Sequence, residues 1–318
     1  MNARLVGMIA ARIGSALLTM VLVSIVIFAL SGLLSSDVAE AILGQSATPE
    51  AVAGLRAAMH LDQPGWQRYL GWATGILSGD PGKSLVNGLP IAEMIGPRLA
   101  NSLRLAGITV LISVPLALTI GIVLAIKRGS LIDRAVSLTI IGIVSVPDFV
   151  IATLAVLLFA VTLHWLPALS MRREFESFGE MARTFALPVL SLSLLVVAQM
   201  IRMTRAAVIS AMTTSYAEAA LLKGASPTRI VLRHALPNAV GPIANAVALS
   251  LSVLLGGVIV VEIIFNYPGV AKLMVDGVAT RDMPLVQTMA MIFCGTYLFL
   301  ITTADIVAIL CNPRLRSR

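Results

Sequence analysis

The sequence predicts an all-α polytopic membrane protein, on the strength of its composition and its long uncharged stretches. Hydrophobic residues make up 58% and charged residues 12% of the 318 positions, and the mean hydropathy is +0.94. A soluble domain carries about twice that share of charge. The uncharged stretches are each near the length that crosses a bilayer as a helix. We therefore expect one transmembrane domain over residues 1–318 with six spans.

The six spans follow one another along the whole chain. They are predicted at about 9–34, 105–126, 135–163, 184–201, 241–262 and 283–310. The first is too long for a cleaved signal peptide, and the third is interrupted only by Asp148. Two polar segments separate the spans most clearly. We expect residues 35–98 to form an extracytoplasmic insertion between the first two spans, and residues 202–240 to form a cytoplasmic loop.

The distribution of Lys and Arg predicts the orientation, because positive residues near span ends are retained in the cytoplasm. In a six-span arrangement, one side of the membrane carries most of the Lys and Arg residues. The only acidic residues on that side are Asp133 and Glu218. Both termini should then be cytoplasmic, and the net charge of +7 is explained without a nucleic-acid partner. The cations on that side are Arg4, Arg12, Lys127, Arg128, Arg134, Arg202, Arg205, Lys223, Arg229, Arg233, Arg314, Arg316 and Arg318.

Nothing in the sequence indicates a catalytic, cofactor-binding or metal site. The segment GDPGKS at 79–84 resembles the end of a phosphate-binding loop, but Leu77 occupies the position where such a loop requires glycine. Cys294 and Cys311 suggest no disulfide or metal framework, and the three histidines lack ligand spacing. We expect no enzyme activity, so energy for any transport must come from a partner.

The segment Tyr216–Asn238 is polar and basic and stands between apolar runs, so it must face water. Residues 216–223 read as a short helix, and Gly224 suits the position that ends a helix. Ser226 followed by Pro227 offers a cap and a first-turn proline for a second helix. The segment is therefore predicted to fold as a helix, a bend and another helix.

The same segment resembles the cytoplasmic EAA loop of ABC importer permeases. Its matching parts are Glu218-Ala219-Ala220, then Gly224, then the HALP run that begins at His234. The resemblance implies a coupling helix that docks on an ATPase subunit, with Glu218, Ala219, Ala220, Gly224, Ala225 and Ser226 as the coupling residues. Histidine at 234 departs from the general pattern but is similar to the branch that imports peptides.

Other segments resemble the oligopeptide, dipeptide and nickel permease branch over nearly the whole chain, in particular its B-type subunit. They are LDQPGWQRYL (61–70), GDPGKSL (79–85), SVPDFV (145–150), AEAALLKGAS (217–226), RHALPNAVGPI (233–243), VVEIIFNYPGV (260–270), RDMPLVQ (281–287) and NPRLR (312–316). Two positions depart from the pattern. The usual PGDP is replaced by residues 35–38, SSDV, and the final Asp-Pro-Arg begins with Asn312.

The resemblance implies the type I ABC importer permease fold and an assembly in the bacterial cytoplasmic (inner) membrane. Its partners would be a second homologous permease subunit, two ATP-binding cassette ATPase subunits that hydrolyse ATP, an extracytoplasmic solute-binding protein and membrane lipid. Short peptides are the expected solutes. Nickel chelates, opines and sugar conjugates remain alternatives within the same class, because the binding protein reads most of the specificity.

Two acids near membrane depth, Asp148 and Glu262, are candidates for the translocation path or for structural pairing. A charge in hydrocarbon is costly, so each should face the bundle interior, water or a partner. Asp148 follows Pro147, and Glu262 precedes the aromatic and proline turn at 265–268. An ion-gradient-driven secondary transporter that uses Asp148, or a channel or scaffold, would be the rival functions. Neither rival accounts for the EAA-like loop.

Overall fold

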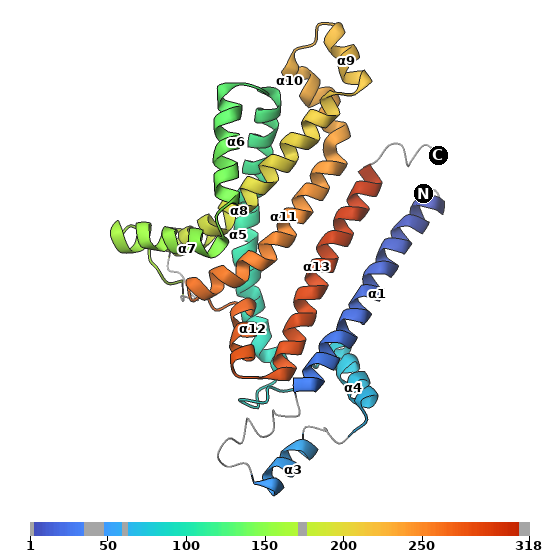
Figure 1. The fold of residues 1–318 in the computed structure, drawn as a ribbon, viewed down its shortest axis with the longest axis vertical. Helices are drawn as coiled ribbons and strands as arrows, with labels where there is room; N and C mark the ends of the chain where they lie inside the picture. The colour runs from blue at the N-terminus through green and yellow to red at the C-terminus, as the bar shows by residue number, and fades with distance from the viewer. Residues whose placement is uncertain (1–2, 35–47, 59–62, 171–176, 312–318) are drawn as a thin grey trace. The chain divides into compact units, whose positions relative to one another are not determined.

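The computed structural model describes residues 3–34, 48–58, 63–170 and 177–311. Within these ranges the chain is mostly helical, and Lys83 and Pro90 form the only bridge between extended residues. The prediction of an all-α polytopic membrane protein is confirmed (Figure 1). The elements are α1 (Ala3–Leu34), α3 (Pro49–Ala58), α4 (Gly65–Ser78), α5 (Ile91–Ile126), α6 (Leu131–Val144), α7 (Asp148–Ala155), η2 (Val156–Thr162), α8 (Phe178–Met212), α9 (Ser215–Leu222), α10 (Pro227–Ile230), η3 (Val231–Ala235), α11 (Leu236–Ile264), α12 (Val270–Ala279) and α13 (Met283–Cys311).

Five helical segments in the described ranges are long and apolar enough to cross a membrane. They are Leu5–Gly32, Ile91–Ile126, Phe178–Met212, Pro227–Ile264 and Met283–Leu310. The bent pair Leu131–Val144 and Asp148–Thr162 provides a sixth candidate. Several of these helices run well beyond the predicted spans, because their polar ends stay helical outside the apolar stretch. The depth at which the bilayer crosses each helix stays a prediction.

The stretch expected as one span at 135–163 is divided by a bend of 100°. Helix α6 ends at Val144, and α7 begins at Asp148 (Figure 1). Pro147 lacks a backbone N–H, and its ring disfavours helical geometry at the preceding Val146, so a break at this point is expected locally. The sequence does not predict the size of the bend, because that depends on the neighbouring helices.

The chain divides into two compact units, and the first comprises residues 1–14, 103–267 and 297–318. Its centre is the contact of α8 with α11, joined by α6 and α7. Small residues allow the close packing that holds membrane helices together. A Cβ atom added at Gly121 of α5 would lie 2.9 Å from the Thr204 Cβ of α8, and one at Gly257 of α11 would lie 3.2 Å from Leu192.

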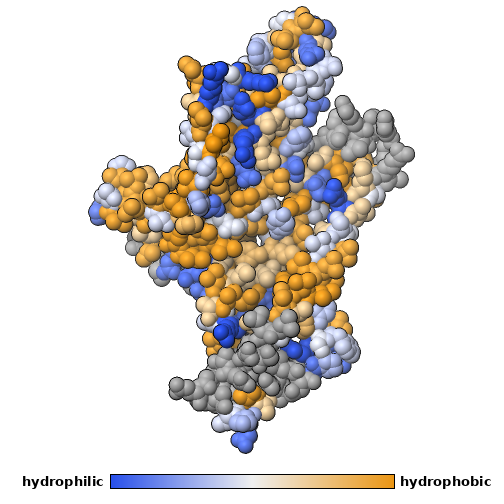
Figure 2. Space-filling model, viewed as in Figure 1, coloured by the Kyte–Doolittle hydropathy of each residue, from blue (hydrophilic) through white to orange (hydrophobic). Residues whose placement is uncertain are grey.

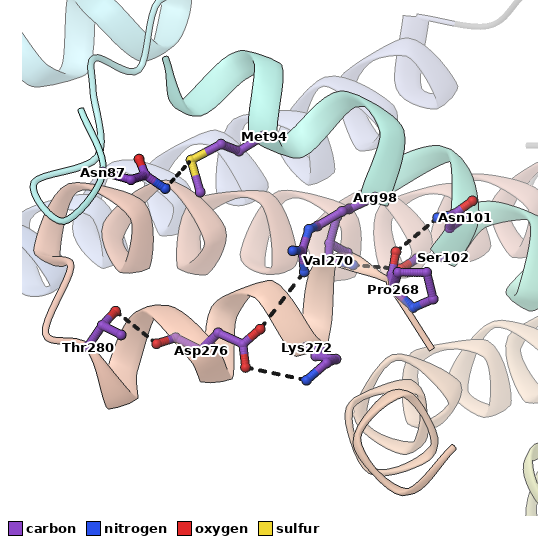
Figure 3. A network of polar contacts seen from close by, with 10 residues as sticks. All are labelled: Asn87, Met94, Arg98, Asn101, Ser102, Pro268, Val270, Lys272, Asp276 and Thr280. Atoms are coloured by element: carbon purple, nitrogen blue, oxygen red, sulfur yellow. Dashed lines mark hydrogen bonds and ion pairs between the residues drawn. The ribbon is translucent and has the colours of Figure 1, made fainter. Parts of the chain in front are cut away.

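The second unit comprises residues 15–102 and 268–296. Its core joins the start of α5 to α12 and the start of α13, through Ile91, Ile95, Val270, Leu273, Leu285 and Met289. Polar contacts on one side of this core fix α12 to α5 (Figure 3). Asn101 donates to the Pro268 carbonyl at 2.9 Å, and the Val270 N–H donates to the Ser102 hydroxyl at 2.9 Å.

Candidate functional site

The predicted helix, bend and helix at Tyr216–Asn238 are present, which confirms the local structure expected there. Helix α9 ends at Leu222, and Gly224 takes the left-handed conformation at φ 78°. The Ala225 N–H bonds back to the Ala220 carbonyl at 3.1 Å. Ser226 then caps α10, whose first residue is Pro227. Glycine adopts a φ of this sign without the strain that a Cβ atom adds for most residues, so the bend favours glycine at position 224.

Helix α9 has one buried and one exposed face. Ala217 and Ala220 are buried against Ile230 of α10, with Ala225 packed beside them. Glu218 and Ala219 are exposed, as is Gly224. The residues expected to approach a partner therefore fall into two groups: Ala220 is buried within the chain, whereas Glu218 and Ala219 are exposed.

The exposed face of α9 is unusually apolar for a segment that is predicted to face water. Leu222 is 89% exposed and Leu221 59%, and Tyr216 near the start of α9 is 41% exposed. Figure 1 shows α9 and α10 projecting beyond the ends of α8 and α11. Exposed apolar side chains that project on a rigid support, with a carboxylate nearby, are a typical surface for binding another protein.

The segment formed by α9 and α10 is held in the first unit by the buried residues that follow it. Residues Val231, Ala239 and Ile243, which follow α10, are buried together with Val208 of α8 and Ala125 of α5. The π-helical segment η3 joins α10 to α11 without an intervening loop. Because α10, η3 and α11 follow one another without a loop, and α9 packs against Ile230 of α10, α9 is connected to α11 through one continuous helical segment.

A buried ion pair that the sequence analysis did not single out lies at the turn between α5 and α6. Arg205 of α8 donates two hydrogen bonds to Asp133, at 2.7 and 2.8 Å. Asp133 is 3% exposed and also accepts from the Gly129 N–H at 2.9 Å. Two signals pointed to it: Ser130 three residues earlier, in capping spacing, and an acid on a basic side. Figure 2 shows hydrophilic residues gathered where α5 turns into α6.

Asp148 and Glu262 lie in different surroundings within the first unit. Asp148 begins α7 and, with Ser191 of α8 and Gly257 of α11, lines a cavity of about 10 Å³. A space of that size holds about one water molecule and no larger solute. Ser191 is buried there with no hydrogen-bond partner for its hydroxyl. The cavity is therefore mainly apolar, with Asp148 and Ser191 as its polar lining residues.

Glu262 is fully buried near the end of α11, beneath a closed aromatic turn. Phe265 and Tyr267 are also buried, and the Tyr267 N–H donates to the Glu262 carbonyl at 2.8 Å. The Tyr267 ring packs edge-on against Phe185 of α8 at 5.7 Å. Burial raises the pKa of the Tyr267 phenol to about 12, so this ring stays neutral at physiological pH.

Two of the motifs that carried the family resemblance contact each other in the second unit. The carboxylate of Asp282, which is 1% exposed, accepts from the Ser84 hydroxyl and, at 3.1 Å, from the Leu85 N–H. Ser84 and Asp282 belong to the segments at 79–85 and 281–287. The GDPGKS segment is therefore a turn fixed to the start of α13, and the departures at 35–38 and Asn312 lie outside the described residues.

Comparison with known proteins agrees with this architecture. Residues 117–317 match the family described as "Binding-protein-dependent transport system inner membrane component", and residues 5–106 match its N-terminal component. The chain belongs to this family of membrane permeases. It is thus a multi-pass permease subunit of a binding-protein-dependent transport system, and the predicted resemblance is confirmed.

Individual relatives are similar over nearly their full length. A probable peptide ABC transporter permease, y4tP of Sinorhizobium fredii, is 32% identical over 306 residues, 96% of this chain and 97% of the relative. A putative peptide transport system permease of Brucella abortus is 34% identical over 313 residues, 98% and 99%. The glutathione transport system permease GsiC of Salmonella choleraesuis is 33% identical over 301 residues, 94% and 95%. An ion-gradient-driven carrier is not favoured by these relatives.

Proposed function

We propose that this chain forms half of the translocation path of an ATP-driven importer for short peptides. A second, homologous permease would form the other half, and an extracytoplasmic binding protein would deliver the solute. The peptide assignment is supported by relatives named as peptide permeases. Nickel chelates, opines and sugar conjugates are the alternative solutes. Ligand binding by the partner binding protein decides among them, because a protein that binds a chelate and no peptide would contradict the assignment.

The coupling of transport to ATP rests on α9. We assign Glu218, Ala219 and the exposed leucines of α9 to a surface that docks in a cleft of an ATPase subunit on the cytoplasmic side. Gly224 fixes the angle between this surface and α10, and the buried contacts of Ala220, Ala225 and Ile230 keep it rigid. In this role ATP binding would move α9, and the continuous helices η3 and α11 would carry the movement into the spans.

Two variants with a matched control test this coupling in the reconstituted complex. Gly224→Val changes the bend, and Glu218→Lys with Ala219→Leu changes the exposed face. Gly88→Val imposes the same strain at another left-handed glycine, φ 70°, in the second unit. Both α9 variants should stay in the membrane but lose most uptake and solute-stimulated ATP hydrolysis, while Gly88→Val keeps both. Wild-type uptake by both α9 variants would refute the proposal.

The energy source has a separate test. Vanadate traps ATPase subunits of this kind, so uptake into vesicles should stop when vanadate reaches the ATPase side. A carrier driven through Asp148 by an ion gradient would be indifferent to vanadate and would stop when the gradient is collapsed. The two treatments together therefore separate the importer from its rival.

A further inference from the structure

Helix α4 (Gly65–Ser78) has an apolar face that the protein covers only in part. Three of its residues, Trp66, Leu70 and Leu77, lie within about 40° of one another around the helix axis at 100° per residue. They are 63%, 51% and 87% exposed. The exposed side of α4 continues around the axis with Thr74, Gln67, Ser78 and Gly71. This side of the helix is therefore apolar at one edge and polar at the other.

The neighbouring face of α4 is held against α1. The Tyr69 hydroxyl and the Ser24 hydroxyl are hydrogen-bonded at 2.8 Å. The Phe28 ring packs against the rings of Tyr69 and Trp72 at 5.5 and 5.8 Å, and the Arg68 guanidinium lies 5.7 Å from its centre. These contacts all lie inside the second unit, so the position of α4 along α1 is well defined.

The span predicted for α1 places that position inside the bilayer. Helix α1 has no charged residue from Ile13 to its end at Leu34. At about 1.5 Å per residue, Ser24 lies roughly 18 Å and Phe28 roughly 24 Å along α1 from Arg12. With Arg12 at the inner boundary, both fall inside a hydrocarbon layer of about 30 Å. A helix that contacts α1 at this depth cannot stand free in water above the membrane.

We propose that α4 is an interfacial helix embedded in the outer leaflet, with Trp66, Leu70 and Leu77 in contact with lipid acyl chains. Its composition fits this environment. Trp and Tyr concentrate where acyl chains meet headgroups, and amphipathic helices bury one apolar face at that boundary. Arg68 lies on the other side of α4, about 160–180° around the axis from these three residues, with its guanidinium over the Phe28 ring of α1. Part of the insertion at 35–98 is then a lateral anchor in the bilayer.

Spin labels on matched neighbours test this placement in the assembled importer reconstituted in liposomes. In a background with Cys294→Ser and Cys311→Ser that retains uptake, cysteine is introduced singly at Leu70, Leu77, Gln67 and Ser78. Collision rates are measured with molecular oxygen, which concentrates in lipid, and with a water-soluble nickel chelate. The oxygen-to-chelate ratio should exceed one at Leu70 and Leu77 and fall below one at Gln67 and Ser78.

Each other outcome overturns the proposal. Chelate accessibility at Leu70 and Leu77 equal to that at Gln67 would place α4 in water. Protection of both leucines from both reagents would show that a protein partner covers the face. A second probe avoids the engineered cysteines: Trp72→Phe with Trp165→Phe leaves Trp66 as the only tryptophan in the chain. Lipids brominated on their acyl chains should quench its fluorescence, and unquenched emission would contradict lipid contact.

Discussion

Arg205 and Asp133 form a bidentate ion pair that fixes the turn between α5 and α6 to α8. Both hydrogen bonds are short, at 2.7 and 2.8 Å, and the Asp133 side chain is 5% exposed whereas that of Arg205 is 28% exposed. The two partners therefore differ in what their loss would leave behind. A carboxylate without its arginine would stay buried, but an arginine without its carboxylate can turn toward water.

This asymmetry predicts that Arg205→Ala destabilises the permease more than Asp133→Ala does. Removing the partner of a buried charge costs about 3 kcal/mol, and the cost falls when the remaining charge can be solvated. Thermal unfolding of the purified complex, followed by loss of the monodisperse chromatographic peak, measures both variants. Equal losses, or a larger loss for Asp133→Ala, would mean that the pair is not buried as the structure has it.

We predict that Gly121→Ala lowers the stability of the permease by disturbing helix packing. Gly107→Ala on the same helix serves as the control. Alanine at 121 would bring its Cβ to 2.9 Å from the Thr204 Cβ and 3.1 Å from the Ile201 carbonyl, so α5 and α8 must separate. We expect a loss of about 1–3 kcal/mol. Gly107→Ala meets nothing within 4 Å and should be neutral or stabilising, because alanine favours helix. The prediction fails if the two variants unfold at the same temperature.

We predict that removing the Asp282 carboxylate destabilises only the turn that it holds in the second unit. Asp282→Ala leaves the Ser84 hydroxyl and the Leu85 N–H without their acceptor in a buried position, at a cost of about 2 kcal/mol. Asp282→Asn keeps an acceptor oxygen and should be milder. Protease added to the outer side of sealed vesicles should cut near Gly82 faster in Asp282→Ala than in Asp282→Asn or the wild type. Unchanged cleavage would show that this contact does not hold the turn.

Much of this structure is predictable from the sequence because the signals are local. The apolar stretches indicated the helices, and Gly224, Ser226 and Pro227 indicated the bend after α9 from their backbone preferences alone. The contacts that join distant segments were not predictable. Asp282 and Ser84 are 198 residues apart, and no spacing rule connects them.

The bend before α7 illustrates the same limit in one element. Pro147 indicates a break, but a break of 100° depends on how α6 and α7 both pack on α8. The exposed faces of α4 and α9 were likewise undetermined, because periodicity shows that a helix has an apolar face and not which part of that face its neighbours cover. The motif likewise did not indicate that Ala220 packs against Ile230 inside the chain, and its coupling role stays a prediction.

Cross-linking from α9 tests the central proposal most directly. A photoreactive amino acid replaces Leu222, which is 89% exposed, or, as control, Leu131, which is 83% exposed at the start of α6. After illumination of the assembled importer in membranes, the Leu222 site should become covalently linked to an ATPase subunit in high yield, and the Leu131 site should not. Absence of an ATPase adduct at Leu222 both with and without ATP would contradict the coupling role of α9.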